Sequence, residues 1–169
     1  MTLVRIIFIF TCFMLPIWSS TNNANEHSFY LITESEYQVM LDELGISSNS
    51  DVNLKSSDSI DVTEGPLIEV LSPSLDDEII ESPLDIEIKF LPGDSGSAVD
   101  KESLKVLYRK LIIKKDITDH VLARADFADN TLVIEGAKLP SGKHTLEVVV
   151  SDELKNESSK KISVKVEES

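Results

Sequence analysis

The segment GKHTLEVVVSD, residues Gly142–Asp152, has the pattern of one long β-strand. Its side chains alternate between two faces, because neighbouring residues of a strand point to opposite sides of a sheet. One face carries Leu146, Val148 and Val150, and the other carries Thr145, Glu147 and Ser151. Turn-forming residues stand at both ends, Pro140-Ser141 before the strand and Asp152 where it stops. A strand of this kind needs partner strands that cover its apolar face.

Partner strands are predicted on both sides of this segment, within residues 66–169. They are expected at residues 67–71, 84–90, 104–109, 131–134 and 161–166, with shorter apolar runs at 79–80 and 111–113. Residues 116–122 are expected to end a strand and enter a helical turn capped by Thr118. Short strands separated by Pro, Gly, Asn and Asp turns, without a long helix, predict an antiparallel β-sandwich of about seven strands.

The composition narrows the functional classes. The chain has 169 residues, which suggests one domain with appendages, and its formal net charge is −14. A field of this sign repels phosphate backbones and anionic lipids, so we expect no nucleic-acid partner and no binding to an anionic membrane surface. The charge favours solubility, and it leaves room for a bound cation or a basic partner.

Residues 1–20 have the pattern of an export signal. Arg5 gives a short positive region, an apolar run follows from Ile6 to Trp18, and small polar residues come next. We expect cleavage near Ser19 or Thr21, with an uncleaved anchor as the alternative. A lipoprotein reading would use Cys12, but it fits poorly because the apolar run continues beyond that residue. Cys12 is the single cysteine, so the processed chain can form no disulfide.

Residues 21–65 are predicted to hold one short helix and a linker. Thr33 and Glu36 form a capping box, and Gly45 is a natural stop, so the helix is expected at 34–44. Its apolar face carries Tyr37, Met40, Leu41 and Leu44. This face can pack on the main domain, or it can dock into a groove of a partner. Residues 46–65 are rich in Ser, Asn and Asp and are expected to be a disordered linker.

Residues 66–168 resemble the immunoglobulin-like (Ig-like) domains of bacterial exported and surface proteins. The resemblance rests on the segments 66–73, 96–106, 116–119 and 139–146. One turn departs from that family, which usually has Asp-x-x-Gly-Asn where this chain has Asp152-Glu153-Leu154-Lys155-Asn156. The resemblance implies an interaction or spacer module of the cell envelope or the extracellular space, and it brings no active site.

Gly93-Asp94-Ser95-Gly96 resembles the sequence around the nucleophile of chymotrypsin-like serine proteases. Such a serine needs a histidine base and a buried carboxylate that orients the base. In that family both precede the serine, but here only His27 does, outside the predicted domain. We therefore interpret this motif as a loop of turn-forming residues.

Metal-binding sites find little support in the sequence. The three histidines, His27, His120 and His144, have no spacing typical of metal ligands. Two acidic turns could offer oxygen atoms to calcium: Asp126, Asp129 and Asn130 in one, and Asp152, Glu153 and Asn156 in the other. Neither has the pattern of a calcium-binding loop. Asn156-Glu157-Ser158 is a glycosylation sequon, which would matter in a eukaryotic host.

The sequence thus predicts an exported, non-enzymatic Ig-like module that binds a protein or a glycan. Binding could use loops such as 91–100 or an exposed sheet edge. The alternative is a structural spacer or subunit that docks through the helix at 34–44. A more remote alternative is a small serine hydrolase that uses Ser95. We expect no cofactor, no metal site and no catalytic residue.

Overall fold

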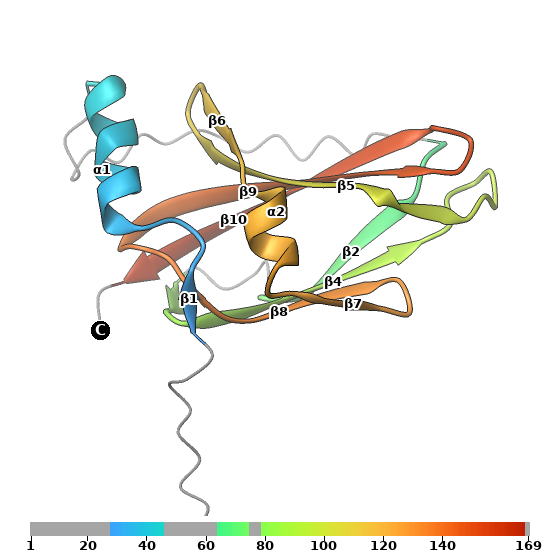
Figure 1. Cartoon of the computed structure of the whole chain (residues 1–169), viewed down its shortest axis with the longest axis horizontal. Coiled ribbons are helices and arrows are strands. Elements are labelled where there is room, and N and C mark those ends of the chain that lie inside the picture. The colour runs from blue at the N-terminus through green and yellow to red at the C-terminus, as the bar shows by residue number, and fades with distance from the viewer. Residues whose placement is uncertain (1–27, 46–63, 75–78, 168–169) are drawn as a thin grey trace, which may run out of the picture.

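The computed structural model describes residues 28–45, 64–74 and 79–167 (Figure 1). Two five-stranded sheets lie face to face in it. The first sheet has the order β1-β8-β4-β2, with β7 paired to β8, and the second has the order β3-β10-β9-β5-β6. The long strand of the sequence, β9, is therefore the central strand of the second sheet. The architecture is an Ig-like β-sandwich, as predicted.

The bounds of the elements follow. In the first sheet they are β1 (Phe29–Tyr30), β2 (Leu67–Ser72), β4 (Leu84–Leu91), β7 (Asp126–Ala128) and β8 (Thr131–Lys138). In the second sheet they are β3 (Ile80–Glu81), β5 (Val99–Lys110), β6 (Ile113–Asp116), β9 (Gly142–Asp152) and β10 (Glu157–Glu167). The helices are α1 (Glu34–Glu43) and α2 (Thr118–Leu122).

The core lies between the two sheets and follows the alternation of the strands. Phe90, Leu132 and Ile162 are fully buried there, together with the inward face of β9. The strands β8 and β10 are longer than predicted. The extra length of β10 comes from its pairing with the long strand β9. The first residues of β10 are polar and have no apolar alternation, yet they pair with Val148–Ser151 of β9.

The outward face of β9 is more covered than its polar residues suggested. Glu147 is almost fully buried, and its carboxylate forms ion pairs with Arg109 at 2.8 Å and with Lys114 at 3.2 Å. Burial raises the pKa of Glu147, but the hydrogen bonds and charges of the two basic side chains outweigh burial, and the pKa lies below its usual value. Glu147 thus holds β6 to the middle of the sheet.

The helical turn after β6 begins one residue earlier than predicted, at Thr118. The N-cap is Ile117, which makes no side-chain cap bond, and Thr118 is already the first residue of α2. The Thr118 hydroxyl accepts a bond from the Val106 amide at 2.9 Å. It also lies 2.6 Å from the Asp116 Oδ1, to which it donates. The predicted capping role of Thr118 was wrong, because its hydroxyl ties α2 to β5 instead.

The helix α1 has its predicted capping box. The Thr33 amide donates to Glu36 Oε2 at 2.9 Å, and the Glu36 amide donates to Thr33 Oγ1 at 3.3 Å. The helix ends at Glu43, and Gly45 follows the C-cap residue Leu44 with a φ of 64°, which suits glycine. Tyr37, Met40 and Leu41 are buried in the same core cluster as the sandwich.

The α1 helix is therefore packed on the domain of its own chain. The Tyr37 hydroxyl accepts a bond from Lys110 Nζ at 2.8 Å, and its ring lies 5.0 Å from that of His144. A Cβ added at Gly142 would lie 2.6 Å from the Tyr37 hydroxyl. The apolar face that was expected to pack on the main domain or on a partner is covered by the domain itself.

Several predicted segments lie outside the described residues. They are the signal at 1–20 and most of the linker at 46–65, of which Glu64 and Gly65 are described. Among the described residues, no helix has the length and apolar character that a membrane span requires.

Candidate functional site

The Gly-Asp-Ser-Gly motif forms a loop at the end of the sandwich. Ser95 Oγ donates to Asp152 Oδ2 at 3.0 Å and accepts from the Ser97 amide at 3.2 Å. A Cβ added at Gly93 would lie 2.0 Å from the Gly65 carbonyl oxygen, so only glycine allows this close approach. Gly96 has a φ of 67°. Each of these motif residues thus has a part in holding the loop, and His27 lies outside the described residues.

His144 is buried near the start of β9, whereas Asp152, which binds Ser95, lies at the end of that strand. Its Nε2 lies 2.7 Å from the Pro140 carbonyl, and its Nδ1 lies 2.7 Å from the Tyr108 hydroxyl. Because a carbonyl only accepts, Nε2 carries the proton, and Nδ1 accepts from Tyr108. Burial lowers the pKa of His144 to about 4, and nearby Lys110 adds to this shift. Both ring nitrogens of the neutral side chain are therefore engaged in holding the fold.

Asp152 organises the turn between β9 and β10. Its side chain is fully buried and accepts from the Asn156 amide at 2.8 Å, from Asn156 Nδ2 at 2.9 Å and from Ser95. Burial raises the pKa of Asp152, but these hydrogen bonds outweigh burial and hold the pKa below its usual value. The carboxylate oxygens and the sequon nitrogen of Asn156 thus bind each other.

The same turn contains the position at which the sequence has Lys155 and no glycine. Lys155 stands where the resembling domains have glycine, and its φ is 69°. Its Nζ forms an exposed ion pair with Asp100 at 2.7 Å. Lys155 thus takes the left-handed backbone conformation at this position of the turn.

Asp129, Asn130 and His120, which were also considered as ligands, have roles in the fold. Asp129 and Asn130 have φ values of 49° and 59° and form the β7–β8 turn. His120 Nε2 donates to the Tyr30 carbonyl at 2.7 Å and so fixes β1 to α2. No group of three or more His, Cys, Asp or Glu side chains placed for a metal occurs among the described residues.

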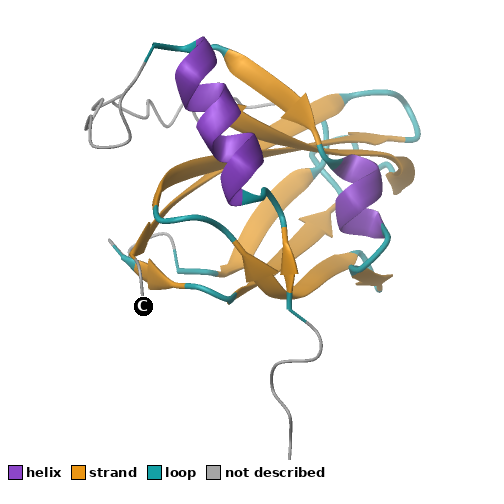
Figure 2. Cartoon of the chain, turned by 60° about the vertical axis from the view of Figure 1, so that its left-hand side comes forward, coloured by secondary structure: helices purple, strands orange, loops and turns teal. Residues whose placement is uncertain are grey.

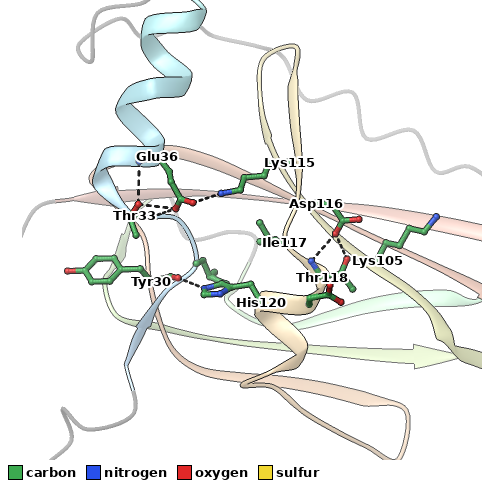
Figure 3. A pocket seen from close by; sticks show the side chains of 11 residues that line it. Tyr30, Thr33, Glu36, Lys105, Lys115, Asp116, Ile117, Thr118 and His120 are labelled. Carbon is green, nitrogen blue, oxygen red and sulfur yellow. Dashed lines mark hydrogen bonds and ion pairs between the residues drawn. The ribbon is translucent and has the colours of Figure 1, made fainter.

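A concave region lies between α1, β6 and α2, and the sequence did not predict it. Figure 2 shows the two helices on the side of the sandwich where β6 forms the sheet edge. A cleft of about 740 Å³ lies there, which we call the α2 cleft. It is lined by Tyr30, Leu31, Thr33, Glu36, Lys105, Lys115, Asp116, Ile117, Thr118, Asp119 and His120 (Figure 3).

An ion pair between Glu36 and Lys115 separates this cleft from a second groove. Glu36 reaches from α1 and Lys115 from β6, and the two side chains bind each other (Figure 3). The hydrogen bond from Lys115, with those from Thr33, lowers the pKa of Glu36 to about 2. On the other side of the pair lies a more apolar groove of about 370 Å³, lined by Ser35, Glu36, Val39, Met40, Glu43, Ile113 and Lys115. We call it the α1–β6 groove.

An apolar turn stands beside this groove. Leu111 and Ile112 connect β5 to β6, and Ile112 is 90% exposed. Leu111 has a φ of 52° at the first position of a two-residue turn, where glycine is favoured. Val39, on the exposed side of α1, is 56% exposed and lines the groove. Residues 111–113 were expected to be a short apolar strand, but only Ile113 belongs to β6, because Leu111 and Ile112 form the turn between β5 and β6.

Comparison with known proteins adds two structures of similar fold. No protein-family model matches the chain, and no curated protein matches its sequence. The crystal structure of CopC from Methylosinus trichosporium OB3b is 14% identical, with a TM-score of 0.35, and the match covers 54% of this chain and 83% of that one. The structure of murine CRIg is 12% identical, with a TM-score of 0.33, and the match covers 60% of this chain and 95% of that one.

Proposed function

We propose that this chain is an exported, non-catalytic binding module whose partner is a protein that docks on the α1–β6 groove and on the turn beside it. The observation that carries the proposal is Ile112. A single exposed aliphatic side chain is normal on a protein surface, but Ile112 adjoins a groove lined by Val39, Met40 and Ile113, and apolar residues gathered in this way mark an interaction site. Beside an apolar groove, the same side chain can be buried by a partner, and such anchors supply most of the energy of an interface.

The chemistry of the groove favours a protein over a glycan. The apolar side chains that line the groove, Val39, Met40 and Ile113, offer no hydrogen bonds to the hydroxyl groups of a sugar, and neither does Ile112 on the turn beside it. Sugar hydroxyl groups placed against these side chains would lose their water contacts without replacement. A peptide can supply an apolar side chain that suits such walls. In the groove Glu36 is paired with Lys115, so Glu43 is the carboxylate that forms no ion pair with another described residue, and the chain has a net charge of −14. We therefore expect a partner segment with an apolar anchor and basic neighbours.

Export is part of the proposal and rests on the sequence. The apolar run from Ile6 to Trp18 after Arg5 has the order of a signal peptide. N-terminal sequencing of the protein recovered from outside the cytoplasm should begin near residue 20 or 22. A chain that keeps Met1 and stays in the cytoplasm would contradict export.

Peptide selection tests the binding site. Peptides are selected from a random display library on the full-length chain and then measured on Ile112→Ser and Val39→Ser. Loss of an anchor of about 2 kcal/mol corresponds to about 30-fold weaker binding. The matched control is Leu154→Ser, which removes a 67% exposed leucine from the turn at the other end of the second sheet. Selected peptides that bind Ile112→Ser as tightly as Leu154→Ser would refute this site.

A further inference from the structure

The strand β6 is the free edge of the second sheet, and half of its main-chain groups face away from that sheet. It pairs with β5 from Lys110↔Ile113 to Leu107↔Asp116. The Ile117 amide donates to the Val106 carbonyl at 2.9 Å, so Ile117 faces β5. Because this orientation alternates along a strand, the main-chain groups of Lys114 and Asp116 point outward. Within the described part of the chain, no other element bonds to them.

The lysines of this edge do not protect it. Edge strands are commonly guarded by lysine side chains, which keep other strands from pairing with them. Here Lys114 is held over the outer face by Glu147 at 3.2 Å, and Lys115 is held toward α1 by Glu36. Both ammonium groups are thus drawn to the two faces of the sheet. The main-chain edge between them is left accessible.

The groove lies where the side chains of an added strand would point. Ile113 and Lys115 share the face of β6 that lines the α1–β6 groove. A strand next to β6 would direct every second side chain to the same face. Glu43 stands at the rim of the groove on α1 and forms no ion pair with another described residue. An apolar side chain can therefore enter the groove while a basic one meets Glu43.

From these observations we propose that the partner segment binds in an extended conformation, as an additional strand of the second sheet beside β6. One of its apolar side chains enters the α1–β6 groove, and a basic side chain lies next to Glu43. This inference rests on the proposed function, because it specifies how a partner occupies the same site. Recognition by strand addition takes affinity from main-chain hydrogen bonds and specificity from alternate side chains.

The test compares two substitutions of one residue, with the peptides selected on the full-length chain as probes. Lys114→Pro removes an amide that points outward, so the β5–β6 ladder is retained, and an edge strand tolerates this proline. Lys114→Ala removes the same side chain and keeps the amide. We expect Lys114→Pro to weaken binding about tenfold or more and Lys114→Ala to change it about twofold at most. Equal affinities of the two variants would overturn strand addition.

A second measurement avoids any change to the chain. The same peptides are synthesised with N-methyl groups on alternate residues, in the two possible phases. One phase should lose binding and the other should keep it, and the Lys114 and Asp116 amides should exchange more slowly with solvent in the complex. Equal binding of the two phases would overturn the inference. If Ile112→Ser already leaves binding intact, the proposed site fails; if only the Lys114 and N-methyl results fail, the site stands without strand addition.

Discussion

Acidification should destabilise this protein through one buried histidine. The pKa of His144 falls from 6.5 to about 4 on folding, mainly because its ring is buried. The unfolded chain therefore takes up a proton at a higher pH than the folded chain does, and stability is lost as pH falls from 6.5 to 4. A tenfold change in proton affinity corresponds to about 1.4 kcal/mol. The free energy of unfolding should drop by about 2 kcal/mol at pH 5 and about 3 kcal/mol at pH 4.

Other titrating groups act mainly at lower pH. Glu36 has a pKa lowered from 4.5 to about 2, so its contribution is present above pH 4.5 and is lost as pH falls to 2. The pKa values of Asp152 and Glu147 are also lowered, so they too stabilise the fold until the pH falls below their unfolded values. The interval between pH 6.5 and 5 therefore isolates His144.

Urea unfolding at a series of pH values measures this effect. The comparison variant is His144→Gln, whose amide can donate to the Pro140 carbonyl and does not titrate. The wild-type chain should lose stability between pH 6.5 and 5, and the variant, although less stable at pH 7.5, should show a much smaller slope. Equal slopes for the two proteins, or a flat wild-type profile in this interval, would refute the assignment of the proton to His144.

Three further substitutions test the joints of the fold. Gly142→Ala should destabilise the chain by about 1–3 kcal/mol more than Gly96→Ala in urea unfolding. The reason is that the added Cβ meets the Tyr37 hydroxyl at position 142 and open space at position 96. Equal losses of stability would contradict the contact between α1 and β9. Ser95→Ala should cost about 1 kcal/mol, the value of one hydrogen bond, and a stability equal to wild type would show that its bond to Asp152 is not formed. Lys155→Gly should raise the Tm, because relief of the strained φ of 69° outweighs the loss of a weak, exposed ion pair. A lower Tm would show that the ion pair contributes more than the strain costs.

Local patterns were sufficient to predict the sandwich and its helix. The alternation of β4 and β9 and the capping box at Thr33 depend on residues close together in sequence, and each is present in the structure. Polar strands and very short strands could not be predicted from such local patterns. β1 has two residues and joins the sheet through Ala137 and Lys138, a pairing across more than half of the chain that no local pattern encodes.

The candidate site was hidden for the same reason. The α1–β6 groove exists because Tyr37 of α1 packs against Gly142 and His144, which brings the helix beside a hairpin far along the chain. In the sequence, Glu36 and Lys115 give no sign of their ion pair. The conspicuous motif around Ser95 forms a loop. The apolar pair Leu111-Ile112 was assigned to a short strand, and only the structure shows that it forms a tight turn beside the groove.

Chemical-shift mapping tests the location of the binding site most directly. The full-length chain, labelled with ¹⁵N, is titrated with a peptide selected on it, and the perturbed amides are placed on the structure. The largest changes should fall on Val39, Glu43 and residues 111–116. Changes centred instead on the loop at 91–100 or on the turn at 152–157 would contradict binding at the α1–β6 groove.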